Sequence, residues 1–218
     1  MERKTKKKTG SSAESYQEAY KTYVLTKGHA PVSVYQFCQE QGTEEADFYQ
    51  YFSHFDAVEQ SIWKAYVQET VQVLEADSAY AEYSGREKLL SFYYTLIEVL
   101  KKNRSFVLYS LKDVRKTDLH PTVLREARKH FLLFLSTLLG EAQAKEEVVS
   151  RPLIGEKYAD ALWVQFRFIL DFWKNDSSAQ FEKTDQAIEK SVNVSFDLMG
   201  KSALDGLFDL AKFLYQNR

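Results

Sequence analysis

The residues best suited to polar chemistry lie inside an apolar stretch. Residues 161–173 are hydrophobic almost all round, yet they include Arg167 and Asp171. A helix without a polar face is buried on several sides, and residues four apart share one face. Arg167 therefore has two interpretations. It forms a structural ion pair with Asp171, or it receives the carboxylate or phosphate of an amphiphile whose tail lies among aromatic side chains.

Other catalytic or metal chemistry finds little support in the sequence. No histidine has cysteine or acidic partners at metal-ligand spacing, and no glycine-rich phosphate loop or nucleophile elbow is present. Cys38 is the sole cysteine, which rules out an internal disulfide and a multi-cysteine zinc site. We expect a protein that is not an enzyme and that uses neither a metal nor a cofactor.

The composition favours long helices. The 218 residues include only eight Gly and three Pro, and the aromatic share of 15% favours a protein that packs against or binds something apolar. The net charge of −2 gives no indication of nucleic-acid binding. No segment approaches the ~20 apolar residues of a membrane span, and the basic first ten residues lack the apolar core of a secretion signal. We expect a soluble, cytoplasmic protein.

The first half of the chain is predicted to contain an arm and four helices. Residues 1–11 form a basic arm, and Ser11 with Glu14 has the spacing of a capping box for a helix that ends at Gly28. Ser33 is expected to cap a short helix that stops at Gly42. A third short helix follows at residues 44–51, and a long one at residues 55–75. Two short helices joined by a glycine turn outline a helix-turn-helix.

The remainder is predicted to be helical as well, which makes the fold class all-α. We expect Thr43 to cap the third helix and Pro121 to occupy the first position of a later one. The later helices are predicted at residues 86–102, 105–111, 121–144, 156–174, 178–201 and 203–216. The domains are therefore an arm at residues 1–11, a three-helix helix-turn-helix domain at residues 12–54, and a helical ligand-binding and dimerisation domain at residues 55–218.

Residues 32–52, VSVYQFCQEQGTEEADFYQYF, resemble the helix-turn-helix of the TetR family of transcriptional regulators in spacing throughout. The pattern has a capping hydroxyl, an apolar pair, a turn glycine and an aromatic end to the recognition helix. The matching positions are Ser33, Val34, Phe37, Gly42, Phe48, Tyr49, Tyr51 and Phe52. The match covers about a tenth of the chain, and the predicted helix order fits the rest.

The resemblance implies a homodimer that places two recognition helices in successive major grooves of double-stranded DNA. The residues it places at the DNA are Ser33, Thr43, Glu44, Glu45, Asp47, Tyr49 and Tyr51. It also implies a pocket for a small apolar or amphipathic ligand. Our candidate ligand-binding residues are Tyr93, Tyr109, Phe131, Phe134, Trp163, Phe166 and Arg167, although core packing is the alternative for the aromatic ones.

Helix 178–201 is expected to help form the dimer. It carries one narrow apolar stripe, which suits pairing at a two-fold axis, while packing within the chain is the alternative. The stripe comprises Ile188, Val192, Ser195 or Phe196, and Met199.

The charge of the head departs from what DNA binding requires. No Lys or Arg lies between Gly28 and Trp63, whereas the same stretch holds six carboxylates, namely Glu40, Glu44, Glu45, Asp47, Asp56 and Glu59. DNA binding draws most of its affinity from neutralised phosphates. Two hypotheses follow: a dimeric, ligand-controlled TetR-like regulator that binds DNA, or a TetR-fold protein that binds a ligand or lipid and has lost DNA binding.

Overall fold

The computed structural model describes residues 12–149 and 155–200, and every regular element in these ranges is helical. The α-helices are α1 (Ala13–Lys27), α2 (Val34–Gln41), α3 (Glu45–Tyr49), α4 (Phe55–Glu75), α5 (Gly85–Lys102), α6 (Arg104–Ser110), α7 (Arg125–Ala144), α8 (Gly155–Asn175) and α9 (Glu182–Met199). Short 3-10 turns occupy Ser78–Glu82, Thr122–Leu124 and Ala179–Phe181. The predicted all-α fold class is confirmed.

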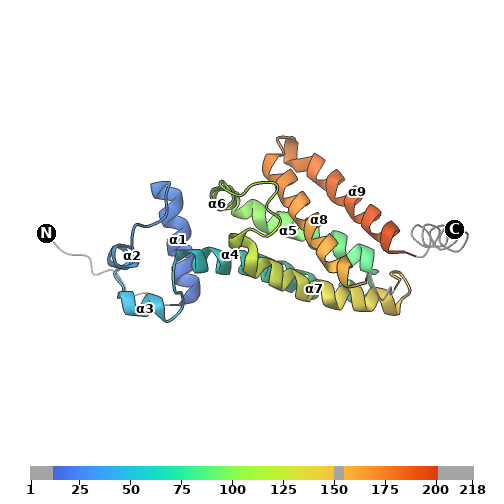
Figure 1. Ribbon diagram of the computed structural model, residues 1–218, viewed down its shortest axis with the longest axis horizontal. Helices are drawn as coiled ribbons and strands as arrows, with labels where there is room; N and C mark the ends of the chain where they lie inside the picture. The colour runs from blue at the N-terminus through green and yellow to red at the C-terminus, as the bar shows by residue number, and fades with distance from the viewer. Residues whose placement is uncertain (1–11, 150–154, 201–218) are drawn as a thin grey trace, which may run out of the picture.

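The molecule is elongated, with a small head of α1–α3 at one end and a helical bundle at the other (Figure 1). Helix α4 begins in the head and continues into the bundle, where it packs mainly on α7 and α5. Helix α9 packs on α5 and α8, and α6 contacts α1. Because α4 belongs to both parts, a displacement of α4 would change the packing of the head and of the bundle together.

The predicted starts and stops of the first helices follow local chemistry. Helix α2 begins at Ser33, whose hydroxyl accepts a bond from the Gln36 amide, and ends at Gly42. Gly28 and Gly42 have φ values of 79° and 71°, a left-handed conformation that favours glycine. The predicted capping box of α1 is wrong by one position, because Ser12 and Ser15 exchange the two bonds.

Two further predicted caps are wrong. The amide of Thr43 donates to the Cys38 carbonyl and completes the C-terminal cap of α2, so α3 starts only after Glu44. Pro121 precedes a 3-10 turn, and α7 begins at Arg125. The arm at residues 1–11, the break at residues 152–155 and the helix at residues 203–216 lie wholly or mainly outside the described residues.

Aromatic rings fill the core of the head. The apolar stripe of α1 meets rings from α2, α3 and the start of α4, and Phe48 lies at the centre. Its ring centroid is 5.4 Å from that of Tyr16 and 5.6 Å from that of Phe55. Edge-to-face pairs of this kind add about 0.5–1.5 kcal/mol each beyond the burial of their area. The aromatic end of the predicted recognition helix is therefore what holds it to α1.

The turn between α8 and α9 is organised by one carboxylate. Asp176 accepts bonds from the amide and hydroxyl of Ser178 at 2.8 and 2.6 Å, and from those of Thr184 at 2.9 and 2.7 Å. Burial alone would raise its pKa, but these four bonds together lower the pKa to about 2. The ionised carboxylate thus fixes where α9 starts relative to α8.

Replacing this carboxylate should loosen the α8–α9 pair. We expect Asp176→Ala to lower the free energy of unfolding at pH 7 by about 2–3 kcal/mol, because buried donors lose a charged acceptor. The difference from the wild type should shrink as the pH falls from 3.8 to about 2, where the native carboxylate is protonated. Urea unfolding measures both, with the exposed Glu189→Ala on α9 as the control. An equal loss in both variants would contradict the assignment.

Candidate functional site

The residues expected to contact DNA are all at least partly exposed. Glu44, Tyr49 and Tyr51 are exposed, Ser33 is exposed and caps α2, and the remaining three are partly buried. The Tyr49 hydroxyl donates to the Glu45 carboxylate at 3.1 Å. Helix α3 has only five residues, so its outer face is short. Whether these side chains contact DNA stays a prediction.

The α2–α3 face is acidic in the described part of the chain. Glu40 and Glu44 are exposed on it, and Glu45 and Asp47 are partly exposed. Of the two lysines of α1, Lys21 pairs with Glu18, and Lys27 lies over the Tyr23 ring. A phosphate brought to this face meets carboxylates at close range, which opposes binding.

Two of the six carboxylates of the head, Asp56 and Glu59, lie on α4 rather than on this face, and Glu59 is partly buried. Glu59 of α4 accepts a bond from the Tyr20 hydroxyl of α1 at 2.6 Å and one from the Ser110 hydroxyl of α6 at 3.2 Å. The indole N–H of Trp63 donates to the same Ser110 oxygen at 2.9 Å. We call Tyr20, Glu59, Trp63 and Ser110 the joint, because they bond α1, α4 and α6 together.

The pKa of Glu59 is raised by burial, although the bonds from Tyr20 and Ser110 oppose the shift. The same burial, together with the bond to Glu59, raises the pKa of Tyr20. Sequence reasoning placed Glu59 among the surface acids of the head. The spacing of Glu59 could have indicated that it faces inward, because it shares one face of α4 with Ile62, Trp63 and Tyr66, which are buried.

Five of the predicted ligand-binding residues come together as a packed aromatic cluster. Phe131 lies at its centre, with ring centroids 4.9 Å from Phe166 and 6.3 Å from Trp163, and Trp163 stacks on Phe166 at 5.0 Å. Tyr93 and Phe134 complete it. Rings this close are in direct contact, so the cluster serves as core. Tyr109 lies apart on α6, under the Lys112 ammonium.

Arg167 is buried, but the predicted ion pair with Asp171 does not form. The Asp171 carboxylate instead pairs with Lys116, at 3.3 Å. The Arg167 Nε atom is buried without a hydrogen-bond partner, and burial lowers the pKa of the guanidinium while Asp171 and Asp118 raise it. Arg167 and Asp171 do lie about one turn apart on α8, but the Asp171 carboxylate pairs with Lys116, a loop residue distant in the sequence.

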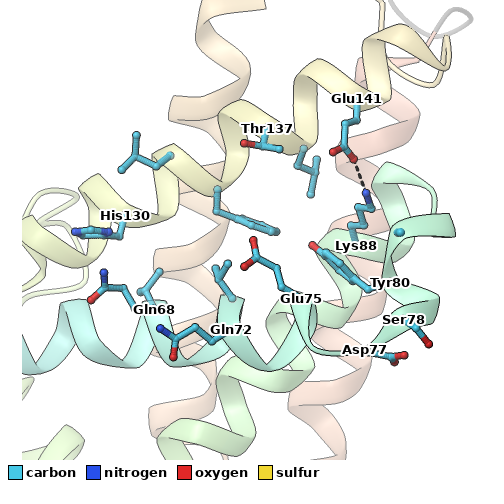
Figure 2. Close-up of a pocket in the computed structure, with 16 residues that line it drawn as sticks. Gln68, Gln72, Glu75, Asp77, Ser78, Tyr80, Lys88, His130, Thr137 and Glu141 are labelled. Carbon is cyan, nitrogen blue, oxygen red and sulfur yellow. Dashed lines mark hydrogen bonds and ion pairs between the residues drawn. The ribbon is translucent and has the colours of Figure 1, made fainter.

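A groove of about 670 Å³ opens between α4 and α7, closed at one end by the turn at Ser78–Glu82 and the start of α5. Figure 2 shows Gln68 and His130 facing each other at one end, and Lys88 paired with Glu141 at the other. The apolar wall consists of Val67, Val71, Leu133, Phe134 and Leu138. Phe134 is the member of the predicted ligand set that lines this groove, and the other wall residues were missed.

A second groove, of about 770 Å³, runs between α8 and α9 on the outside of the bundle. Its apolar rim residues Val164, Phe168 and Val194 are 44–57% exposed. The stripe predicted to pair subunits faces the other way, because Ile188, Val192, Phe196 and Met199 are buried against the bundle. The alternative, packing within the chain, is correct for that stripe.

Comparison with known proteins identifies the class of this chain. Residues 88–214 match the tetracyclin repressor-like, C-terminal domain family, which is more than half of the chain. The chain therefore belongs to the TetR family. No described helix is long and apolar enough to cross a membrane.

Two solved structures share the fold. A protein from Shewanella sp. PV-4, assigned to the TetR family of transcription regulators, has a TM-score of 0.59 and 15% identity, over 87% of this chain and 98% of that one. A protein of unknown function from Rhodococcus sp. RHA1 has a TM-score of 0.57 and 14% identity, over 89% and 98%. None of the curated proteins matches this chain.

The joint makes a testable contribution to stability. Because the folded-state pKa of Glu59 lies above its ordinary value of 4.5, its contribution is full below that pH and is lost as the pH rises through the folded-state pKa. We expect the free energy of unfolding of Glu59→Gln to increase relative to that of the wild type over this range, because Gln does not ionise. Urea unfolding between pH 4.5 and 8 measures it. The same trend in Glu69→Gln, exposed on the same helix, would contradict the role of Glu59.

Proposed function

We propose that this TetR-family chain is a dimeric transcription regulator whose heads contact DNA and whose bundle responds to a small amphipathic ligand. The observation that carries the proposal is the path of α4. Its first half holds the joint with α1 and α6, and its second half lines the α4–α7 groove. A ligand that moves α4 against α7 therefore also shifts the head, which changes the distance between two paired heads.

The α8–α9 groove supports pairing with a second copy. Gln165 is 6% exposed, lines this groove, and its amide oxygen and nitrogen are both buried without a hydrogen-bond partner. Unsatisfied buried amides are costly, about 1–3 kcal/mol, and a partner at this groove relieves that cost if the side chain turns outward to meet a donor and an acceptor. The exposed rim of Val164, Phe168 and Val194 provides apolar area around this polar centre.

The head supports DNA contact through its shape and its tyrosines. Tyr49 and Tyr51 are exposed on and just after α3, at 52% and 43%. Hydroxyl groups donate to phosphate oxygens in many protein–DNA interfaces. Five basic residues in the sequence at residues 1–11, Arg3, Lys4, Lys6, Lys7 and Lys8, offer the positive charge that the α2–α3 face lacks.

A second function has a specific observation in its favour. The four carboxylates on the α2–α3 face, without a nearby Lys or Arg between residues 28 and 63, favour a TetR-fold ligand- or lipid-binding protein that no longer binds DNA. Both functions share the dimer and the ligand. They differ in whether the head binds nucleic acid, which is decided by measurement of DNA affinity.

The pairing surface is tested by a charge placed in the α8–α9 groove. We expect Val194→Glu to convert a dimer into a monomer, because the new carboxylate replaces apolar area in the groove rim and must lose its hydration at the interface. Size-exclusion chromatography with light scattering gives the mass. Val73→Glu, a similarly exposed valine on α4, should leave the dimer intact. A monomeric wild type, or a dimeric Val194→Glu variant, would contradict the interface.

DNA binding is tested with the full-length chain and labelled genomic fragments from the source organism, by fluorescence anisotropy. We expect affinity that falls with salt, at a slope of roughly −0.9 per contacted phosphate. Glu44→Gln should strengthen binding by about two- to five-fold, because it removes one repulsive charge. Glu69→Gln, outside the head, should leave the affinity unchanged. Absence of salt-dependent binding would establish the second function instead.

A further inference from the structure

We propose that the α4–α7 groove takes a lipophilic cation: a compact apolar body that carries an amine or quaternary ammonium group. The inference deepens the proposed function, because it names the chemical class of ligand to which the bundle responds. It rests on the charge of the lining, on an internal ammonium already seated there, and on the position of the apolar wall relative to both.

The lining of the groove is negative. It contains the carboxylates of Glu75, Asp77 and Glu141 and one ammonium, that of Lys88, which leaves a net charge of −2. The remaining basic side chain, His130, does not change this balance at neutral pH, because burial and then Lys64 lower its pKa. A bound cation gains from this field, whereas a bound anion is repelled by it.

Two of these carboxylates act on the same small region. Both Glu141 and Glu75 raise the pKa of the Tyr80 hydroxyl, which burial together with them brings to about 12. Figure 2 shows Glu75 rising from α4 into the space between the helices, on the side where Tyr80 and Lys88 lie. Glu75 is also the last residue of α4, so the partial negative charge of that helix end lies in the same place.

Lys88 shows what this region binds. Its ammonium pairs with Glu141 and lies 5.2 Å from the centroid of the Tyr80 ring. An aromatic face and a carboxylate together form the environment that proteins use for ammonium groups. The Lys88 side chain is 8% exposed and that of its partner is 44% exposed, so Glu141 can turn toward a second cation in the groove without being pulled from the interior.

The apolar wall fits the rest of such a ligand. Val71, Phe134 and Leu138 line the groove together with Tyr80 and Glu75. An apolar body against this wall places its charged end near Glu75 and Glu141. A volume of about 670 Å³ lies within the range of small-molecule pockets, about 300–1,000 Å³. An amphiphile of opposite sign would bring its charge to the same carboxylates and would be disfavoured there.

The test compares three probes of one chain length against the full-length protein by isothermal titration calorimetry, below their aggregation concentrations. The probes are dodecyltrimethylammonium, dodecanoate and dodecanol. We expect the cation to bind most tightly. Glu141→Gln and Glu75→Gln should each lower the affinity for the cation by about five-fold, as expected for partly exposed charge pairs. Glu69→Gln, on α4 but outside the groove, should leave it unchanged.

The Lys88→Met variant tests whether the preferred ligand is positively charged. Removal of the internal ammonium should raise the affinity for the cation several-fold, because a competing positive charge is lost. The same variant should bind dodecanoate more weakly. Circular dichroism melting of each variant confirms that it is folded, and the exposed Glu75→Gln carries the test if Lys88→Met is unstable. Tighter binding of dodecanoate, equal binding of dodecanol, or weaker cation binding by folded Lys88→Met would overturn the inference.

The outcomes also separate this inference from the proposed function. If the protein binds DNA and forms dimers but prefers dodecanoate or dodecanol, the ligand class is wrong and the regulator stands. If the cation binds as expected while no DNA fragment binds, the ligand class holds for a binding protein without DNA activity.

Discussion

The carboxylate of Glu59 joins three helices that are distant in the sequence, and the two-part architecture depends on it. It accepts a hydroxyl from α1 and a hydroxyl from α6 while it is carried by α4, so the head cannot turn relative to the bundle without loss of a charge-assisted bond. Because Glu59 is partly buried, a broken bond leaves a charged group poorly satisfied by water, which is more costly than a broken bond at the surface. The joint therefore makes the head follow α4.

This constraint connects the α4–α7 groove to the head through α4. The groove lies along the second half of α4 and begins at Val67, about one turn beyond Trp63 of the joint on the same 21-residue helix. A helix is stiff over this length, so a ligand that separates α4 from α7 acts directly on Glu59 and Trp63. The aromatic cluster of α5, α7 and α8 is packed ring to ring and would provide the rigid body against which a ligand moves α4.

The outer face of α8 and α9 completes the arrangement. Asp176 fixes the register of the two helices, and their exposed apolar residues surround the unpartnered amide of Gln165. No residue that lines the α8–α9 groove also lines the α4–α7 groove, so a second copy bound there leaves the α4–α7 groove open. Figure 1 shows α9 at the edge of the bundle opposite α4 and α7. In the proposed regulator, pairing and ligand binding therefore use different surfaces of one bundle. The acidic α2–α3 face opposes the electrostatic attraction on which DNA binding ordinarily depends.

Local patterns in the sequence determined the helices and some of their ends. Apolar residues at intervals of three and four marked the buried stripe of α1 and the face of α4, and Ser33, Gly28 and Gly42 marked caps whose chemistry lies within one turn. The helix-turn-helix motif and its family followed from the same short segment. Such features depend on residues close in sequence, so they can be inferred without the fold.

Only the tertiary structure decided which partners meet across the chain. Asp171 bonds to Lys116 rather than to Arg167, and Glu59 turns inward to Tyr20 and Ser110 rather than outward to solvent. Most of the aromatic residues expected to line a pocket pack as core, while the groove is formed by polar and apolar residues of α4 and α7 that carry no motif. Periodicity states which face of a helix is buried, but the packing of separate helices decides what that face meets.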